Sequence, residues 1–171
     1  MPRPQPGFVS RPRLVGRLGE GVAAGMVVVS APAGFGKTVL LADWARSGGQ
    51  PMAWLSLDAG NNDPMRFWRH AIGALDEVRP GIYARVSASL GPPAPASFEG
   101  LVTALINEFA EPGEGDVSLM LDDYHLVDAQ SVHASLTFLL EHRPPGLHLV
   151  LASRSDPPLP LARLAGRPAA G

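Results

Sequence analysis

The sequence predicts a three-layer α/β fold built on a mostly parallel sheet. Four short apolar segments have the β-branched or leucine-rich composition of buried strands. Helical patterns lie between them, and connections of this kind normally cross over between parallel strands. The expected strands cover residues 27–29, 51–57, 117–121 and 147–152.

The helical patterns between these strands carry start and stop signals. Asp63 is a suitable N-cap and Pro64 a suitable first residue for a helix whose apolar face holds Met65, Trp68, Ile72 and Leu75, with His70 at the surface. Residues 80–96 are interrupted by proline and glycine, and we assign them no role. A short helix is expected from about Leu14 to Gly19. Three further helices are expected over residues 38–47, 97–109 and 129–141.

Residues 26–38, MVVVSAPAGFGKT, join the first strand to the first long helix. They match the phosphate-binding pattern G-x-x-x-x-G-K-[ST], except that Ala31 replaces the first glycine. The proline after Ala31 favours extended backbone there, which alanine adopts freely. A phosphate chain is bound by the free amides at the start of a helix. Glycines in the preceding loop let the anion approach the backbone closely. The expected contacts are Ala33, Gly34, Phe35, Gly36, Lys37, Thr38 and Val39.

Lys37 is the only lysine among the 14 Lys and Arg residues of the chain. A compact ammonium differs chemically from the planar guanidinium used everywhere else, so its place in the phosphate pattern favours a functional role. The alternative interpretation is a glycine-rich turn that happens to precede a lysine. The order strand, turn, helix argues against it.

Further candidates follow the third and fourth strands, whose carboxyl ends meet the phosphate loop at one sheet edge. We expect Mg²⁺ between Thr38 and Asp122, and Asp123 beside it to polarise an attacking water. Arg154 would contact the γ-phosphate. Non-functional alternatives stay open. Asp122 and Asp123 could simply begin an ordinary turn, and Arg154 could be a surface residue that pairs with Asp156. His125 follows the acid pair. We interpret it as a loop residue, and contact with the site is the alternative.

Composition excludes several other classes of protein. A net charge of −2 gives no electrostatic reason to expect nucleic-acid binding by this segment. The absence of cysteine excludes disulfides and thiolate metal sites. No apolar run is long enough to cross a bilayer, and the N-terminus lacks the apolar core of a signal peptide. We therefore expect a cytoplasmic protein without a membrane partner.

Four collinear blocks carry a more specific resemblance. APAGFGKTVLLADWA, AWLSLDAGNNDPMRFW, LMLDDYHLV and FLLEHRPPGLHLVLASRSDPPLPLARL together resemble the ATPase module of MalT-like, LuxR-family transcriptional activators, a branch of the STAND signal-transduction ATPases. The resemblance covers about residues 8–165. It implies an ATP- and Mg²⁺-dependent switch that self-associates in the full-length protein and is reset by slow hydrolysis. It also implies that Arg11 and its neighbours up to Leu14 line the adenine.

The departures from that family are equally informative. The sensor, winged-helix and helix-turn-helix segments are not among these 171 residues, so DNA would be contacted only through a C-terminal domain missing here. The fifth strand that the resemblance implies beside the first is also missing, and we expect an aggregation-prone fragment with an open sheet edge. We divide the chain into a flexible lead-in (1–10), an ATP-binding domain (11–160) and a truncated tail (161–171).

Two other functions compete with the regulatory switch. One is a stand-alone P-loop NTPase or small-molecule phosphotransferase, for which Arg79 and Arg85 are the candidates for an arginine lid. The other is a truncated gene product with a disabled site. ATP affinity of the wild type and of a Lys37 variant would separate them.

Overall fold

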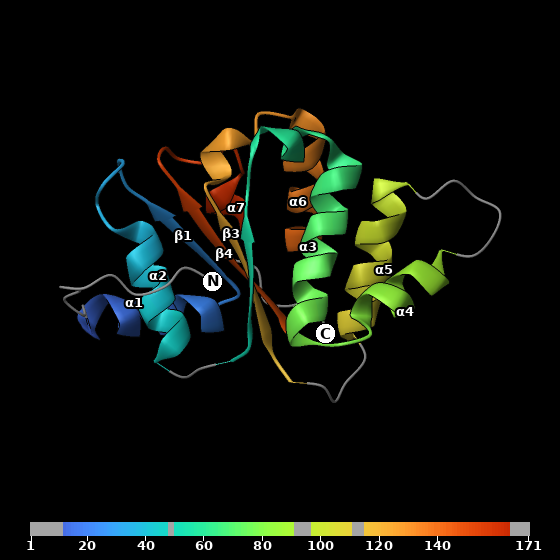
Figure 1. Ribbon diagram of the computed structural model, residues 1–171, viewed down its shortest axis with the longest axis horizontal. Coiled ribbons are helices and arrows are strands. Elements are labelled where there is room, and N and C mark those ends of the chain that lie inside the picture. The colour runs from blue at the N-terminus through green and yellow to red at the C-terminus, as the bar shows by residue number, and fades with distance from the viewer. Residues whose placement is uncertain (1–11, 48–49, 91–96, 111–114, 165–171) are drawn as a thin grey trace.

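The computed structural model describes residues 12–47, 50–90, 97–110 and 115–164. Within these ranges four parallel strands form one sheet in the order β1-β4-β3-β2, with helices on both faces (Figure 1). The predicted three-layer α/β architecture is therefore confirmed. The strands are β1 (Met26–Ser30), β2 (Met52–Ser56), β3 (Val117–Asp122) and β4 (Leu147–Ser153).

The two faces of the sheet bury alternate residues of each strand, as the two-residue period of a strand requires. On β3, Leu119 and Leu121 join the larger apolar core, whereas Met120 joins the smaller one. On β4, Leu149 and Val150 divide in the same way. Both central strands are buried along their whole length, which explains their unbroken apolar sequences.

Helices α1 (Pro12–Ala23) and α2 (Lys37–Arg46) cover one face, on the left of Figure 1. Leu18 and Val22 of α1 pack in the smaller core with Leu41 and Trp44 of α2. Helix α1 continues past Gly19, where the sequence predicted its end. A Cβ atom on Gly21 would lie 2.6 Å from Cγ2 of Val27, so this glycine permits close packing of α1 on β1.

Helices α3 (Pro64–Val78), α4 (Ile82–Ser89), α5 (Phe98–Ala110) and α6 (Gln130–Glu141) belong to the opposite side. Helix α3 begins as predicted, because Oδ1 of Asp63 accepts a hydrogen bond from the Arg66 amide at 2.7 Å and Pro64 is the first residue. Helix α4 lies in the stretch to which the sequence assigned no role. Its buried Ile82 and Val86 belong to the larger core.

The connections that follow β2 and β3 are short 3₁₀ helices, η1 (Ala59–Asn62) and η2 (Tyr124–Leu126). Asp58 caps the first of them: its Oδ1 accepts the Gly60 amide at 2.7 Å, and Oδ1 of Asn61 accepts the Asp58 amide at 3.0 Å. These reciprocal bonds fix the backbone at the carboxyl end of β2.

Strand β1 forms one edge of the sheet, and no strand of the described ranges pairs with its outer side. Its residues are at most half-buried, unlike those of β3 and β4. At the chain end, α7 (Leu161–Leu164) occupies part of the expected tail, where Leu161 packs on the larger core and Arg163 pairs with Glu141. The predicted lead-in, Arg11 and residues 165–171 lie outside the described residues.

A bilayer crossing needs a long apolar helix, and none of the helices in the described ranges meets that requirement.

Candidate functional site

The loop between β1 and α2 has the backbone of an anion-binding turn. Gly34 and Gly36 adopt left-handed conformations with φ of 83° and 76°, which other residues rarely adopt. The Ala31 amide donates to the Ser153 carbonyl at 3.2 Å and so ties the loop to the end of β4. Gly36 caps α2 without a side-chain bond, leaving the amides of the first turn available to a ligand.

The ammonium of Lys37 lies against the carbonyl side of this loop. Its Nζ donates to the Ala31 carbonyl and, at 3.1 Å, to the Pro32 carbonyl. An ammonium has three donors and a flexible stem, so it can exchange these carbonyls for phosphate oxygens without a change in the loop. The loop therefore joins one mobile positive charge to a row of amides.

Thr38 and Asp122 meet although 84 positions separate them in the sequence. The Thr38 hydroxyl donates to Oδ2 of Asp122 at 3.1 Å, and the Asp123 amide donates to Oδ1 at 3.0 Å. Burial raises the pKa of Asp122 above its ordinary value, although these hydrogen bonds act in the opposite direction. The carboxylate is thus held in a place where a cation would offset its charge.

This donor set fits Mg²⁺ rather than a metal held by protein alone. Mg²⁺ prefers hard oxygen ligands and commonly takes one or two protein groups together with phosphate oxygens and water. Thr38 and Asp122 supply two such oxygens next to the phosphate loop. No cluster of three or more His, Asp or Glu side chains within the described ranges could hold a metal unaided.

Asp123 is the N-cap of η2, directly after the strand that delivers Asp122. It is the one non-glycine residue of the described ranges with positive φ, 58°, which turns the chain sharply at the strand end. Its side chain is 42% exposed, so its carboxylate can reach water. Nδ1 of His125 lies 3.8 Å from Oδ1 of Asp123, too far for a hydrogen bond, and is itself buried without a hydrogen-bond partner among the described residues.

Arg154 follows β4 at the same sheet edge and is exposed. Within the described ranges, Arg154 forms no ion pair with Asp156 and no hydrogen bond or ion pair with the other candidates. The structure thus brings Lys37, Thr38, Asp122 and Asp123 together and places Arg154 at the same sheet edge.

A pocket of about 430 Å³ adjoins the phosphate loop on the face covered by α1. Leu14 lines it, as the expected base-binding segment would, and so does Phe35, which is 64% exposed. Arg17 was not singled out from the sequence, although its position one helical turn after Leu14 is a signal that could have identified it. Arg11 lies outside the described residues.

The two arginines considered for a phosphotransferase lid are used in packing. The guanidinium of Arg79 lies 4.6 Å from the ring centre of Phe109, and Arg79 is buried. Arg85 forms an ion pair with Glu108 of α5. Both belong to the α3–α4–α5 layer, whereas the pocket beside the phosphate loop is covered by α1, so the lid interpretation is not supported.

The parallel sheet with helices on both faces is a three-layer α/β fold. It is of the P-loop type, because a glycine loop and a lysine follow β1 and an acidic residue ends β3. Cdc6p from Pyrobaculum aerophilum shares the fold, with a TM-score of 0.61 at 14% identity over 95% of this chain and 46% of its own. The Orc1 protein of Aeropyrum pernix gives a TM-score of 0.57 at 17% identity over 88% of this chain and 40% of its own. At these identities the likeness concerns the fold alone.

The sequence relatives are more specific. HTH-type transcriptional regulators named MalT from Serratia proteamaculans and Yersinia enterocolitica are 36% and 34% identical over 156 residues, 91% of this chain. The MalT regulator of Vibrio cholerae is 32% identical over 157 residues. No protein-family profile matches the chain. The chain is homologous to a segment of the MalT regulators, as the sequence motifs predicted, and it spans 17% of the length of these curated relatives.

Proposed function

We propose that this chain is the ATP-binding switch domain of a MalT-like, LuxR-family regulator of the STAND type, with slow Mg²⁺-dependent hydrolysis resetting the switch. One observation carries the proposal: Lys37 and the first-turn amides of α2 lie beside the Thr38–Asp122 pair. This arrangement combines an anion site with a place for the cation that accompanies a nucleoside triphosphate. Self-association and DNA contact would belong to the longer protein, outside these residues.

The proposal gives each candidate residue a separate role. Residues 33–39 and the Lys37 ammonium would hold the phosphates, with Thr38 and Asp122 on Mg²⁺, which supplies charge neutralisation when bound. Asp123, partly exposed beside them, would orient the attacking water, and Arg154 would contact the γ-phosphate. The pocket lined by Leu14 and Arg17 would take the base, together with Arg11.

Removing the ammonium tests the phosphate site. Lys37→Ala should weaken ATP binding about tenfold or more, because a charge-assisted contact to phosphate is lost. Titration with a fluorescent ATP analogue in the presence of Mg²⁺ measures the affinity. Arg69→Ala is the matched control, since Arg69 is an exposed cation on α3, across the sheet from the loop. Equal affinity of Lys37→Ala and the wild type would refute the site.

Replacing Asp123 tests the division of roles. Asp123→Asn should leave ATP affinity nearly unchanged and slow hydrolysis, because the amide cannot take a proton from water. Phosphate release under single-turnover conditions, set beside the titration, separates the two quantities. Collapse of ATP binding in this variant would mean that Asp123 holds the nucleotide or its metal instead.

A further inference from the structure

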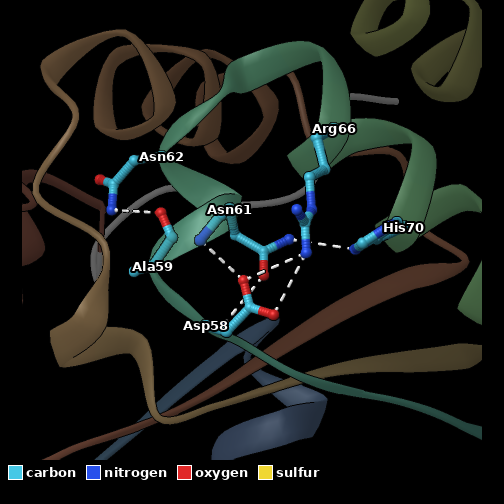
Figure 2. Close-up of polar contacts among 7 residues, drawn as sticks. Asp58, Ala59, Asn61, Asn62, Arg66 and His70 are labelled. Carbon is cyan, nitrogen blue, oxygen red and sulfur yellow. Dashed lines mark hydrogen bonds and ion pairs between the residues drawn. The ribbon is translucent and has the colours of Figure 1, made fainter.

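Two consecutive asparagines of η1 point to opposite sides of this short helix (Figure 2). Asn61 is buried and completes the local turn, bonding to the Asp58 amide at 3.0 Å and to Nδ1 of His70 at 3.2 Å. Asn62 extends away from that cluster. Only one of its bonds, from Nδ2 to the Ala59 carbonyl at 3.1 Å, stays within η1.

The remaining bonds of Asn62 reach a segment more than 60 positions later in the chain. Nδ2 donates to the Leu126 carbonyl at 3.0 Å. Oδ1 accepts the amides of Asp128 at 2.7 Å and Ala129 at 2.8 Å. A carboxamide offers two donors and two lone pairs, so every hydrogen-bonding position of this side chain is used.

The segment that Asn62 holds, residues 123–129, connects β3 to α6 and carries Asp123 at its start. Its first end is fixed by the bond from the Asp123 amide to Asp122, where the backbone has the unfavourable positive φ of 58°. At its other end, Ala129 caps α6 without a side chain of its own that could bond the helix start. Asn62, from a different element, accepts the amides of Asp128 and Ala129, which directly precede the first turn of α6.

We propose that Asn62 is a positioning residue that keeps residues 123–129 in place and thereby fixes the Asp123 carboxylate for its role toward water. The inference rests on the proposed function for its catalytic consequence, but the tether itself is independent of nucleotide. It also gives the segment DAGNNDP a purpose: Asn61 and Asp58 hold the loop, and Asn62 connects it to the acidic end of β3.

The first test measures the tether without any nucleotide. Hydrogen exchange of the peptide covering residues 123–129 should be faster in Asn62→Ala than in the wild type, because the Asp128 and Ala129 amides lose their acceptor. Asn107→Ala is the matched control: it changes the same residue type at an exposed position of α5 and bonds to nothing in 123–129. Asn62→Asp keeps an acceptor oxygen for these two amides and should restore most of the protection. Equal exchange in Asn62→Ala and the wild type would overturn the tether.

The second test measures the consequence for turnover. Asn62→Ala should lower the rate of ATP hydrolysis by about tenfold or more at nearly unchanged ATP affinity, since small misplacements of a catalytic group have large effects on rate. Asn107→Ala should keep the wild-type rate. Unchanged turnover in Asn62→Ala, or the same loss in both variants, would refute the positioning role. If the wild type binds no ATP, the proposed function fails, and the exchange experiment still decides whether the tether exists.

Discussion

The two faces of the sheet are built very differently. The α3–α6 side holds large side chains that are completely buried, among them Phe67, Trp68 and Leu105, at 0% exposure. The α1–α2 side has a smaller core, and the edge strand β1 that it covers is only half-buried. Layers with many fully buried side chains contribute most of the stability of a domain, because burial of apolar area is the largest favourable term.

The candidate site is assembled at the boundary between these two parts. Lys37 and Thr38 come from the lightly covered part, whereas Asp122 ends the fully buried strand β3 and Asp123 follows it. A rigid strand can hold a carboxylate in a fixed place, and a less densely packed loop can adjust to a ligand. The comparison thus predicts that substitutions in the two parts affect stability and binding unequally.

The largest expected effect is on the α3–α6 side. Trp68→Ala should lower the free energy of unfolding by about 3–5 kcal/mol, since it leaves a large cavity at a fully buried position. Chemical denaturation followed by circular dichroism measures this. Trp68→Phe, which removes the Nε1 bond to Ser135 at 2.9 Å but keeps a ring, should cost clearly less. A loss below 1 kcal/mol for Trp68→Ala would contradict the assignment of the main core.

Two valines provide a matched comparison of the parts. Val27 of edge strand β1 and Val150 of central strand β4 are register partners on neighbouring strands. Val150→Ala should reduce the free energy of unfolding by roughly 2 kcal/mol, and Val27→Ala by about half of that, because only Val150 is fully buried. Urea denaturation of both variants side by side is the measurement. Equal losses would indicate that β1 is covered as well as β4.

Acidification should act through the buried pair Tyr124 and His133, whose hydroxyl and Nδ1 lie 2.7 Å apart. Burial lowers the pKa of His133 in the folded protein below its ordinary value near 6.5. The unfolded chain then binds a proton that the folded one does not, so stability is complete above about pH 6.5 and falls as the pH decreases below it. Urea midpoints across this range should show that dependence, and His133→Gln should reduce it. An unchanged slope in that variant would assign the effect to other histidines.

The smallest effect is expected at the site itself. Burial raises the pKa of Asp122 above its ordinary value of 3.8, so the folded protein binds the proton more readily and loses stability as the pH rises through the folded-state pKa. Without metal, Asp122→Asn should therefore be slightly more stable than the wild type at neutral pH, with a smaller difference in acid. Thermal melts without and with Mg²⁺-ATP measure this. A constant loss of stability at every pH would show that the carboxylate is structurally favourable.

Local signals were sufficient for most of the elements. The Asp63 cap with Pro64 identified the start of α3, and apolar periodicity identified α5 and α6. The sequence shows only a weak helical pattern for α4, because proline and glycine on both sides obscure an eight-residue helix whose two buried residues give little periodicity. The 3₁₀ helix η1 was missed because its capping partner is Asn61, whereas the usual signature has Glu or Gln at that position.

The site was predictable in its parts but not in its contacts. A glycine pattern before a lysine identifies an anion loop, since backbone freedom and helix amides act locally. The distances from Thr38 to Asp122 and from Asn62 to residues 126–129 were not predictable, since they depend on strand order and packing.

By itself, the sequence determined which segments become strands and helices, where the phosphate loop lies, and that acidic residues end the third strand. Tertiary structure decided that β4 lies between β1 and β3, that Thr38 reaches Asp122, and that Asn62 reaches the start of α6. The physical reason is range: backbone preferences and burial periods act over a few residues, whereas contacts across 60 or more positions exist only once the sheet has its order and register.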